Sequence, residues 1–421
     1  MIILKIDPTM IITSLVVFLA VILLLVIVLL VAKRYLVATG DVTITINGEN
    51  QVVAESGSTL LNTLSTQSIY LPSACGGGGS CAQCKCQVLE GGGEILPTET
   101  VHFSRKEIKD HWRLGCQVKV KNDMSIHMEE SILGVKKWEC EVVSNRNVAT
   151  FIKEFVVKLP EGEKLNFTSG GYIQIDVPEY DLKFTDFAIE EQFRGDWEKF
   201  KMFDLACKNE EETMRAYSMA NYPAEGNIVM LNVRIATPPF DRAKGGWADD
   251  IKPGLCSSYI FNLKPGDKVQ VSGPFGEFFP ILNSKKEMLY VGGGAGMAPL
   301  RSHVLHLLNT LKITDRKITY WYGARSKKEI FYEQDFRKLE AEFPNFKFNI
   351  ALSEPQPEDN WTGMVGFIHQ VIHDEYLNKH DAPEDIEYYM CGPGPMAKAV
   401  EKMLWDLGVP RENLMFDDFG A

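Results

Sequence analysis

Ala74-Cys-Gly-Gly-Gly-Gly-Ser-Cys-Ala-Gln-Cys84 is the stretch that decides the first fold of this chain, and a fourth cysteine follows at Cys116. Four thiolates in a C-x5-C-x2-C…C arrangement suit a [2Fe–2S] cluster, and glycines let the backbone curl closely around it. The spacing is longer by one residue than the plant-type C-x4-C-x2-C, which changes the loop length without removing a ligand. We expect Cys75, Cys81, Cys84 and Cys116 to bind the cluster.

A structural zinc site is the alternative for the same four thiolates. Zinc ribbons pair two short C-x2-C knuckles, whereas here three of the cysteines share one glycine-rich loop, which favours iron. Disulfides are disfavoured because the remainder of the chain has the character of a cytoplasmic protein. Cys86 is a surplus thiol, and we expect it to be a small buried apolar residue.

The residues around this loop predict a small α+β domain over residues 40–128. Val42, Ile44 and Ile46 alternate with polar residues, and Asn47-Gly48 supplies a hairpin turn. A helix is expected over 58–64 and a further strand over 117–120, beside the late cysteine. Together with the cysteine loop, these elements resemble the β-grasp ferredoxin fold.

The segment before this domain predicts a transmembrane helix over residues 8–34. No charged residue occurs between Pro8 and Ala32, which is long enough at ~1.5 Å per residue to cross a hydrocarbon core of ~30 Å. A cleaved signal peptide is the alternative, but its apolar region would be too long and no small-x-small site follows. Lys33 and Arg34 favour a short N-terminus outside and large cytoplasmic domains.

The composition is that of a multidomain globular protein. The chain has 421 residues, of which 45% are apolar and 24% charged. The net charge of −12, with no long Lys/Arg run to offset it, argues against a nucleic-acid partner.

Residues 137–280 are rich in short strands with few helices, which predicts an antiparallel β-barrel. Arg215-Ala-Tyr217-Ser218 lies on one of these strands and offers a cation, an aromatic plane and a hydroxyl, the groups that FAD requires. Farther along, Gly254 and Ser257 open a helix whose free N–H groups can hold a phosphate. A surface arginine beside a core tyrosine, and a plain helix-capping serine, are the alternatives. The polar and aromatic stretch 180–213 interrupts the strands and is expected to be a lid or a docking surface. A solvated face is the alternative for its acidic end.

Residues 285–421 alternate strands with helices, which predicts a parallel α/β sheet that binds a nucleotide. A strand, a glycine turn and a helix start, the layout that accepts a pyrophosphate, are predicted in the stretch Tyr290-Val-Gly-Gly-Gly-Ala-Gly-Met-Ala-Pro-Leu300. We expect binding there by Gly292, Gly294, Gly296 and Pro299. The pattern G-x-G-x-G-x-x-P is more typical of flavin reductases than of dehydrogenases.

Cys391-Gly392-Pro393 ends the last expected strand, at the edge of the sheet where ligands bind in open α/β folds. Cys391 could therefore contact a nicotinamide. A buried thiol before a turn is the alternative.

The order of these motifs resembles the ferredoxin–NADP reductase superfamily with an appended [2Fe–2S] domain. The N-terminal helix, the 180–213 insertion and the ending Phe416-Asp-Asp-Phe-Gly-Ala421 make it similar to the F-subunit family of Na⁺-translocating NADH:quinone oxidoreductases, over essentially the whole chain. This resemblance implies that Arg215, Tyr217, Ser218 and Ser257 hold FAD. It also implies catalytic roles for Ser218, Cys391 beside the nicotinamide, and Phe419 near the flavin.

The resemblance further implies an NADH-oxidising subunit of the bacterial inner membrane. It would pass hydride to FAD, then single electrons to the [2Fe–2S] cluster, partner membrane subunits and ubiquinone, in an enzyme that transports sodium. Because the helix has no ionisable residue, we expect it to anchor the chain and not to conduct the ion. One alternative is the reductase component of a multicomponent oxygenase, against which the helix counts. Another is a non-catalytic module that merely binds flavin.

Overall fold

The computed structural model describes residues 8–36, 40–241, 245–248 and 250–417. The chain divides into two compact units, each described by itself below. The first comprises residues 1–71 and 84–130, and the second comprises residues 72–83 and 131–421. The expected domain bounds 8–34, 40–128, 137–280 and 285–421 remain predictions.

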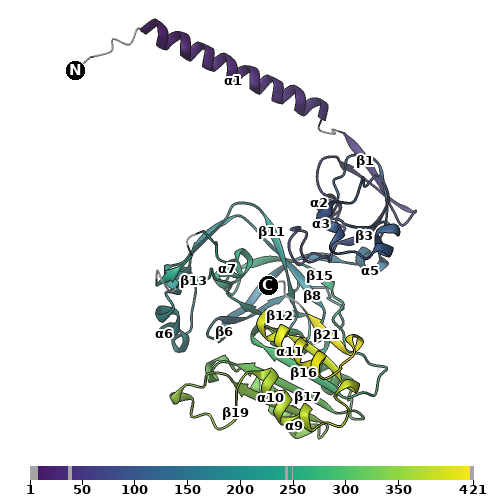
Figure 1. Ribbon diagram of the computed structural model, residues 1–421, viewed down its shortest axis with the longest axis vertical. Helices are drawn as coiled ribbons and strands as arrows, with labels where there is room; N and C mark the ends of the chain where they lie inside the picture. The colour runs from purple at the N-terminus through teal and green to yellow at the C-terminus, as the bar shows by residue number, and fades with distance from the viewer. Residues whose placement is uncertain (1–7, 37–39, 242–244, 249, 418–421) are drawn as a thin grey trace, which may run out of the picture. The chain divides into compact units, whose positions relative to one another are not determined.

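The first unit begins with helix α1 (Pro8–Leu36), coloured purple in Figure 1. Its side chains are described over residues 13–28, and all of them are exposed. Within the part of the chain that the structure describes, no helix meets the length and apolarity needed to cross a membrane. The transmembrane segment therefore remains a prediction.

A mixed five-stranded sheet forms the body of the first unit, in the order β2-β1-β5-β3-β4. The hairpin of the first two strands pairs antiparallel, and β1 pairs parallel with β5, as in a β-grasp. The buried side chains of Val42, Ile44 and Ile46 confirm the expected alternation. The strands are β1 (Asp41–Ile46), β2 (Asn50–Glu55), β3 (Lys85–Glu90), β4 (Trp112–Leu114) and β5 (Met124–His127).

Helix α2 (Leu60–Thr66) packs Leu60, Leu61 and Leu64 into the core, and Thr59 Oγ1 caps it by accepting from the Asn62 amide at 3.3 Å. Two shorter helices complete this unit, α3 (Pro97–Thr100) and α4 (Arg105–Lys109), and α5 (Glu130–Leu133) begins at its last residue.

The strand expected over 117–120 is wrong. After Cys116 the chain turns back, because the amides of Gln117 and Val118 both donate to the carbonyl of Leu114, at 2.8 and 3.2 Å. Only an isolated bridge between Thr59 and Lys119 remains among the described residues there. The local turn takes the donors that a strand would offer to a neighbour.

The barrel of the second unit is a six-stranded antiparallel sheet in the order β11-β8-β15-β6-β7-β12. An isolated bridge between Met219 and Leu231 joins its two edges. The strands are β6 (Lys136–Ala149), β7 (Ile152–Lys158), β8 (Tyr172–Val177), β11 (Thr213–Ser218), β12 (Ile228–Arg234) and β15 (Lys268–Phe275). Helix α7 (Leu255–Asn262) and a small hairpin of β13 (Phe240–Asp241) and β14 (Gly246–Trp247) precede the last strand.

The insertion at 180–213 forms a structure of its own on the barrel. Its strands β9 (Tyr180–Lys183) and β10 (Ala206–Asn209) pair antiparallel and enclose helix α6 (Glu191–Lys199). Phe184, Phe193 and Trp197 are buried in the same hydrophobic cluster as the barrel strands. The insertion is therefore part of the packed core.

The α/β part of the second unit is an all-parallel sheet in the order β19-β18-β17-β16-β20-β21 (Figure 1). Strand order reverses beside β16, so the carboxyl ends of β16 and β20 flank the crevice where such folds bind ligands. The strands are β16 (Met288–Gly293), β17 (Ile318–Ala324), β18 (Phe346–Leu352), β19 (Met364–Val365), β20 (Glu387–Cys391) and β21 (Leu414–Asp417).

Helices cover both faces of this sheet. Tyr290 and Tyr320 share one hydrophobic cluster with residues of α8 (Met297–Leu305) and α9 (Glu333–Glu342). On the opposite face, residues of α10 (Ile368–Glu375) and α11 (Gly394–Asp406) pack in another cluster. Helix α8 continues into a π-helical turn, His306–Thr310.

Candidate functional site

Strand β11 carries the three residues expected to hold a flavin. Arg215 and Tyr217 are half-buried, and Ser218 is buried at the end of the strand. The guanidinium of Arg215 donates to the carbonyl of Met214 at 2.7 Å and to Thr213 Oγ1 at 3.2 Å, both next to it in sequence. Local acceptors thus hold this cation on the barrel in a position to meet an anion.

Ser218 is linked to the α/β part by a hydrogen bond that the sequence did not predict. Its Oγ donates to Oδ2 of Asp417, on β21, at 2.5 Å across 199 positions of the chain. Asp417 in turn lies beside Cys391 in the parallel register of β21 and β20. The end of β11 therefore meets the carboxyl ends of the sheet strands.

Gly254 and Ser257 lie at the start of helix α7, which packs against β11. Ser257 Oγ accepts from the Ala236 amide and donates to the Gly254 carbonyl, each at 3.1 Å. Because the hydroxyl is engaged in this way, it braces the loop before α7. A methyl on Gly254 would lie 2.6 Å from Ala236 Cβ, so only glycine permits this close approach.

The glycine turn after β16 has the geometry expected of a phosphate-binding turn. Gly292 lies within strand β16. Gly294 (φ +56°) and Gly296 belong to the 3₁₀ turn that follows, and this turn leads directly into α8, where Pro299 is the third residue. A methyl on Gly292 would lie 2.6 Å from the Tyr320 hydroxyl. The turn therefore brings a helix amino end to the crevice, where its dipole favours an anion.

Cys391 is buried at the end of β20, in register with Gly292 on β16. Gly392 and Pro393 follow immediately and precede helix α11. The two motifs that the sequence placed far apart are thus neighbours at one edge of the sheet.

A cavity of about 500 Å³ opens at this edge. Gly293, Gly294, Pro393 and Met396 line it from the α/β part. The barrel adds three residues to its wall: Phe151, Ile152 and Arg234. Its place at the strand carboxyl ends and its size suit a dinucleotide.

Two arginines that sequence reasoning missed line this cavity. Arg234 ends β12, and Arg325 follows β17. Partial desolvation and then repulsion from the Arg325 guanidinium lower the pKa of Arg234. Two facing cations make the cavity suited to an anionic ligand such as a pyrophosphate. Arg325 could have been found from its position directly after a parallel strand, but Arg234 gave no such signal.

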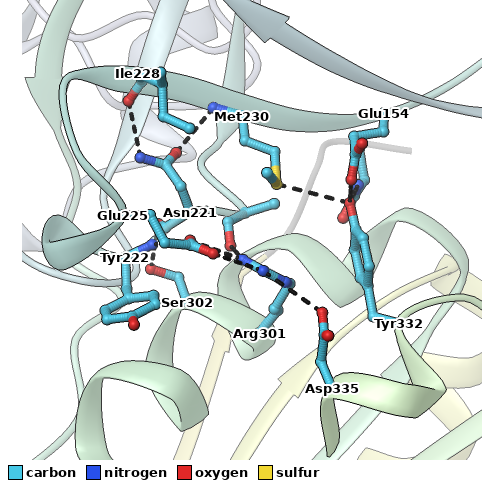
Figure 2. A network of polar contacts seen from close by, with 12 residues as sticks. Glu154, Asn221, Tyr222, Glu225, Ile228, Met230, Arg301, Ser302, Tyr332 and Asp335 are labelled. Carbon is cyan, nitrogen blue, oxygen red and sulfur yellow. Dashed lines mark hydrogen bonds and ion pairs between the residues drawn. The ribbon is translucent and has the colours of Figure 1, made fainter. Parts of the chain in front are cut away.

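A network of polar contacts fixes the α/β part on the barrel, as Figure 2 shows. Arg301 of α8 is buried and donates to the Ala220 carbonyl at 2.8 Å and to both carboxylate oxygens of Glu225, at 2.7 and 2.9 Å. Its guanidinium lies 4.9 Å from the ring centroid of Tyr332. The Tyr332 hydroxyl donates to Glu154 at 2.6 Å.

These contacts join the two halves of the cavity. Ala220 lies just beyond Ser218, and the helix that carries Arg301 begins at the glycine turn. Ser302 adds a bond to the Asn221 carbonyl at 2.8 Å. The network therefore ties the end of β11 to the helix that follows the glycine turn.

The cysteine loop is divided between the two units. Cys75 and Cys81 belong to the second unit, and their sulfurs lie 3.3 Å apart. The hydrogen bond from Cys81 lowers the pKa of Cys75 to about 3 and raises the pKa of Cys81. The sulfurs of Cys75 and Cys81 therefore converge within the loop.

The same loop contacts the barrel. The Tyr172 hydroxyl donates to Gln83 Oε1 at 2.9 Å. Gln174, also on β8, donates to the carbonyl of Ser73 at 3.4 Å. A methyl on Gly76 would overlap the guanidinium of Arg215 and lie 2.6 Å from the Met214 carbonyl oxygen. The loop is thus packed directly on the expected flavin strand.

Cys84 and Cys116 belong to the first unit and are both buried. The Gly115 amide donates to the Cys84 carbonyl at 2.8 Å, which ties the two segments together. Among the described residues, no group of three or more His, Cys, Asp or Glu is arranged to hold a metal ion. The four-cysteine ligand set therefore remains a prediction. Cys86 is buried, as expected of a small core residue, and burial raises its pKa to about 12.

Phe419, expected near the flavin, lies outside the described residues. Asp417, two residues before it in sequence, is the partner of Ser218.

Three family models match the chain. The "2Fe-2S iron-sulfur cluster binding domain" matches residues 44–121, the "Oxidoreductase FAD-binding domain" matches 198–279, and the "Oxidoreductase NAD-binding domain" matches 290–402. The cysteine loop, the strand β11 with α7, and the glycine turn each fall within the corresponding match.

Curated relatives match nearly the entire chain, and three of them are named as the F subunit of "Na(+)-translocating NADH-quinone reductase". The relative in Pseudomonas aeruginosa (strain UCBPP-PA14) is 56% identical over 391 residues, covering 93% of this chain and 94% of the relative. The relative in Methylococcus capsulatus (strain ATCC 33009 / NCIMB 11132 / Bath) is 57% identical over 390 residues, with coverages of 93% and 94%. That of Marinomonas sp. (strain MWYL1) is 55% identical over 411 residues, with coverages of 98% and 99%.

Solved structures share the fold at lower identity. The Amycolatopsis cytochrome P450 reductase GcoB is 22% identical with a TM-score of 0.62, and the ferredoxin reductase in carbazole 1,9a-dioxygenase is 24% identical with a TM-score of 0.58. Each comparison covers 90% of this chain and 98% of the solved one. At these identities the likeness concerns the fold alone.

Proposed function

The chain belongs to the family of F subunits of Na⁺-translocating NADH-quinone reductases, and from this membership we propose that it is the NADH-oxidising subunit of such an enzyme. Its cofactors are FAD and a [2Fe–2S] cluster, and NADH is its substrate, in agreement with the three matched domains. The relatives' names favour this function over that of an oxygenase reductase, with which only the fold is shared.

One observation carries the proposal. Strand β11 is contacted near its start by the cysteine loop, where Gly76 packs on Arg215, and at its end by the α/β part, where Ser218 bonds Asp417. A group bound along this strand therefore has a dinucleotide cavity on one side and a cysteine pair on the other. This is the arrangement that a relay of electrons from NADH requires.

The residues around β11 fit a flavin chemically. We assign Arg215 to its pyrophosphate, together with the amino end of α7 at Gly254 and Ser257. Tyr217 is assigned to its ring system. Ser218 holds a proton on Oγ that Asp417 orients, and it is assigned to the hydride-accepting side of the flavin.

Around the cavity, Gly292, Gly294, Gly296 and Pro299 are assigned to the NADH pyrophosphate, with Arg234 and Arg325 as its counter-charges. Cys391, Gly392 and Pro393 are assigned to the nicotinamide end. Phe419 keeps its proposed place near the flavin.

The chemistry of the donor set supports the cluster assignment. Cys75, Cys81, Cys84 and Cys116 offer soft thiolates, and the Cys75 and Cys81 sulfurs already converge. When bound, flavin takes up two electrons as a hydride and releases them singly, while a [2Fe–2S] cluster accepts one at a time. The protein thus divides an electron pair into single electrons for its partners.

We further propose that residues 8–34 anchor the chain in the bacterial inner membrane as a single pass, with the short N-terminus outside and the large domains in the cytoplasm. The exposed apolar side chains of α1, from Leu15 to Val28, support this proposal. Other membrane subunits of the complex would receive the electrons and pass them to ubiquinone, with coupled sodium transport.

Stopped-flow reduction of the detergent-solubilised full chain tests the proposal. Adding NADH should bleach the flavin absorbance near ~450 nm, and EPR of the reduced protein should then show a rhombic [2Fe–2S] signal. Changing Cys75 to Ala should abolish the EPR signal and leave flavin bleaching in place. A purified chain that contains zinc in place of iron, or that NADH does not bleach, would contradict it.

A further inference from the structure

Phe151 is an aromatic residue in the wall of the dinucleotide cavity, supplied by the barrel and not by the glycine turn or the parallel strands. It lies in the turn between β6 and β7, next to Ile152. A methyl built on Gly294 would lie 3.9 Å from Ile152 Cδ1, an ordinary van der Waals distance, so the start of β7 lies next to the phosphate turn. Phe151, in the turn, and Ile152, at the start of β7, therefore supply apolar wall to the cavity beside the glycines.

The insertion at 180–213 holds Phe151 in place from behind. The ring centroids of Phe151 and Phe200 are 5.7 Å apart in an edge-to-face arrangement, and the Phe151 and Trp197 centroids are 6.2 Å apart. Trp197 is fully buried, and its indole Nε1 donates to the carbonyl of Thr150 at 2.7 Å. Both aromatic neighbours come from the insertion: Trp197 lies in α6, and Phe200 follows the last residue of that helix. Phe151 therefore lies between the cavity and the carboxyl end of α6.

Polar contacts of the insertion fix the same turn at further points. Glu190 accepts from the Asn147 amide at 2.9 Å, at the end of β6. The buried Lys153 of β7 donates to the carbonyl of Ala188 at 2.7 Å. Both strands that flank Phe151 are therefore bonded to the segment just before α6.

The insertion also reaches the opposite side of the cavity. Asp196 of α6 pairs with Lys328 at 2.8 Å, and the next residue, Glu329, lines the cavity. One short helix is therefore linked both to the barrel wall of the cavity and to its α/β wall.

We propose that Phe151 contacts the bound NADH and that the insertion, through Phe200 and Trp197, positions it; this inference rests on the proposed function. The insertion is then neither a lid nor a docking surface but a support for the substrate wall. It acts on the affinity for the dinucleotide.

Kinetics of the full chain with NADH and ferricyanide test this assignment. Phe151→Ala should raise the KM for NADH roughly tenfold, because it removes the apolar wall, with kcat within about twofold of wild type. Phe200→Ala, which leaves the wall residue but removes its support, should raise KM by roughly threefold. The inhibition constant of ADP-ribose, a probe that undergoes no hydride transfer, should rise with KM in each variant.

Phe203→Ala is the matched control. The Phe203 ring also belongs to the insertion and lies 5.6 Å from Trp197, but the described contacts of Phe151 do not include it. We expect its KM to match wild type. An unchanged KM in Phe151→Ala, or an equal rise in Phe200→Ala and Phe203→Ala, would overturn the proposal. A wild-type chain that fails to oxidise NADH would instead overturn the proposed function.

Discussion

Two glycine-rich segments of this chain use glycine for different reasons. In the cysteine loop, Gly76, Gly77 and Gly79 have φ values of +65°, +91° and +77°, a backbone region that side chains disfavour. In the turn after β16, Gly296 has φ −60°, which any residue adopts, yet a methyl there would overlap the carbonyl of Cys391. The first segment mainly requires backbone freedom, and the second mainly requires space.

The difference reflects what each segment approaches. The cysteine loop must curl so that Cys75 and Cys81 meet, and curvature demands left-handed residues. The turn after β16 must bring α8 close to β20, so that a helix amino end and Cys391 share one crevice. Substitutions to alanine separate the two requirements, because alanine adds one methyl and restricts φ.

The largest effect is expected for Gly296→Ala. The methyl has no space beside the backbone of Cys391, so α8 and β20 must separate, at a cost of about 3 kcal/mol. Differential scanning calorimetry should show a strongly lowered Tm, together with a raised KM for NADH. A Tm within 2 °C or so of wild type would show that space is not what this glycine supplies.

Gly76→Ala should have the next largest effect, because it combines left-handed strain with overlap of the Arg215 side chain, at a cost of about 2 kcal/mol. We expect a lower iron content and a lower flavin content in the purified protein. Gly78→Ala is the matched control: its methyl would lie 3.6 Å from the Cys75 carbonyl oxygen, an ordinary contact, so both contents should stay normal.

The helix that follows the second turn gives a pH-dependent test. Burial lowers the pKa of His303, on α8, to about 4, compared with 6.5 unfolded. Between these values the unfolded chain binds a proton that the folded chain does not, so stability falls as pH drops, by roughly 2 kcal/mol at pH 5. The His303→Gln variant should show a flatter decline of Tm from pH 7 to pH 5; parallel profiles would refute this role.

The smallest effect is expected for Gly294→Ala. Its φ of +56° strains alanine, but the nearest atom to the added methyl is 3.9 Å away, so the cost is about 1 kcal/mol. Tm should fall slightly. A fall as large as that of Gly296→Ala would contradict the view that Gly294 is required for its backbone φ and Gly296 for the space around it.

Local patterns predicted most of the elements. The helix expected over 58–64 is found as α2, and the alternating residues of β1 are buried as expected. The glycine turn and the Cys391 motif were also predictable, because parallel strands align their carboxyl ends. These features depend on residues near one another in sequence.

The missed features depend on distant residues. Asp417 meets Ser218 across 199 positions, and no local signal marks either residue as the partner of the other. In the sequence, Phe151 cannot be told from other apolar turn residues, because its contacts with Trp197 and Phe200 involve residues 46 and 49 positions away. The absent strand at 117–120 has a different, local cause, because the amides of Gln117 and Val118 bond the Leu114 carbonyl in a turn.

The closure of the barrel has a consequence for cofactor loading. Its two edge strands are joined by the isolated bridge of Met219 and Leu231, next to which the Ala220 amide donates to the Met230 carbonyl at 2.7 Å. A ring closed at one such point can widen there without breaking the long ladders between its other strands. We expect the flavin-free chain to exchange the Ala220 amide with deuterium faster than those of β7, and added FAD to slow that exchange.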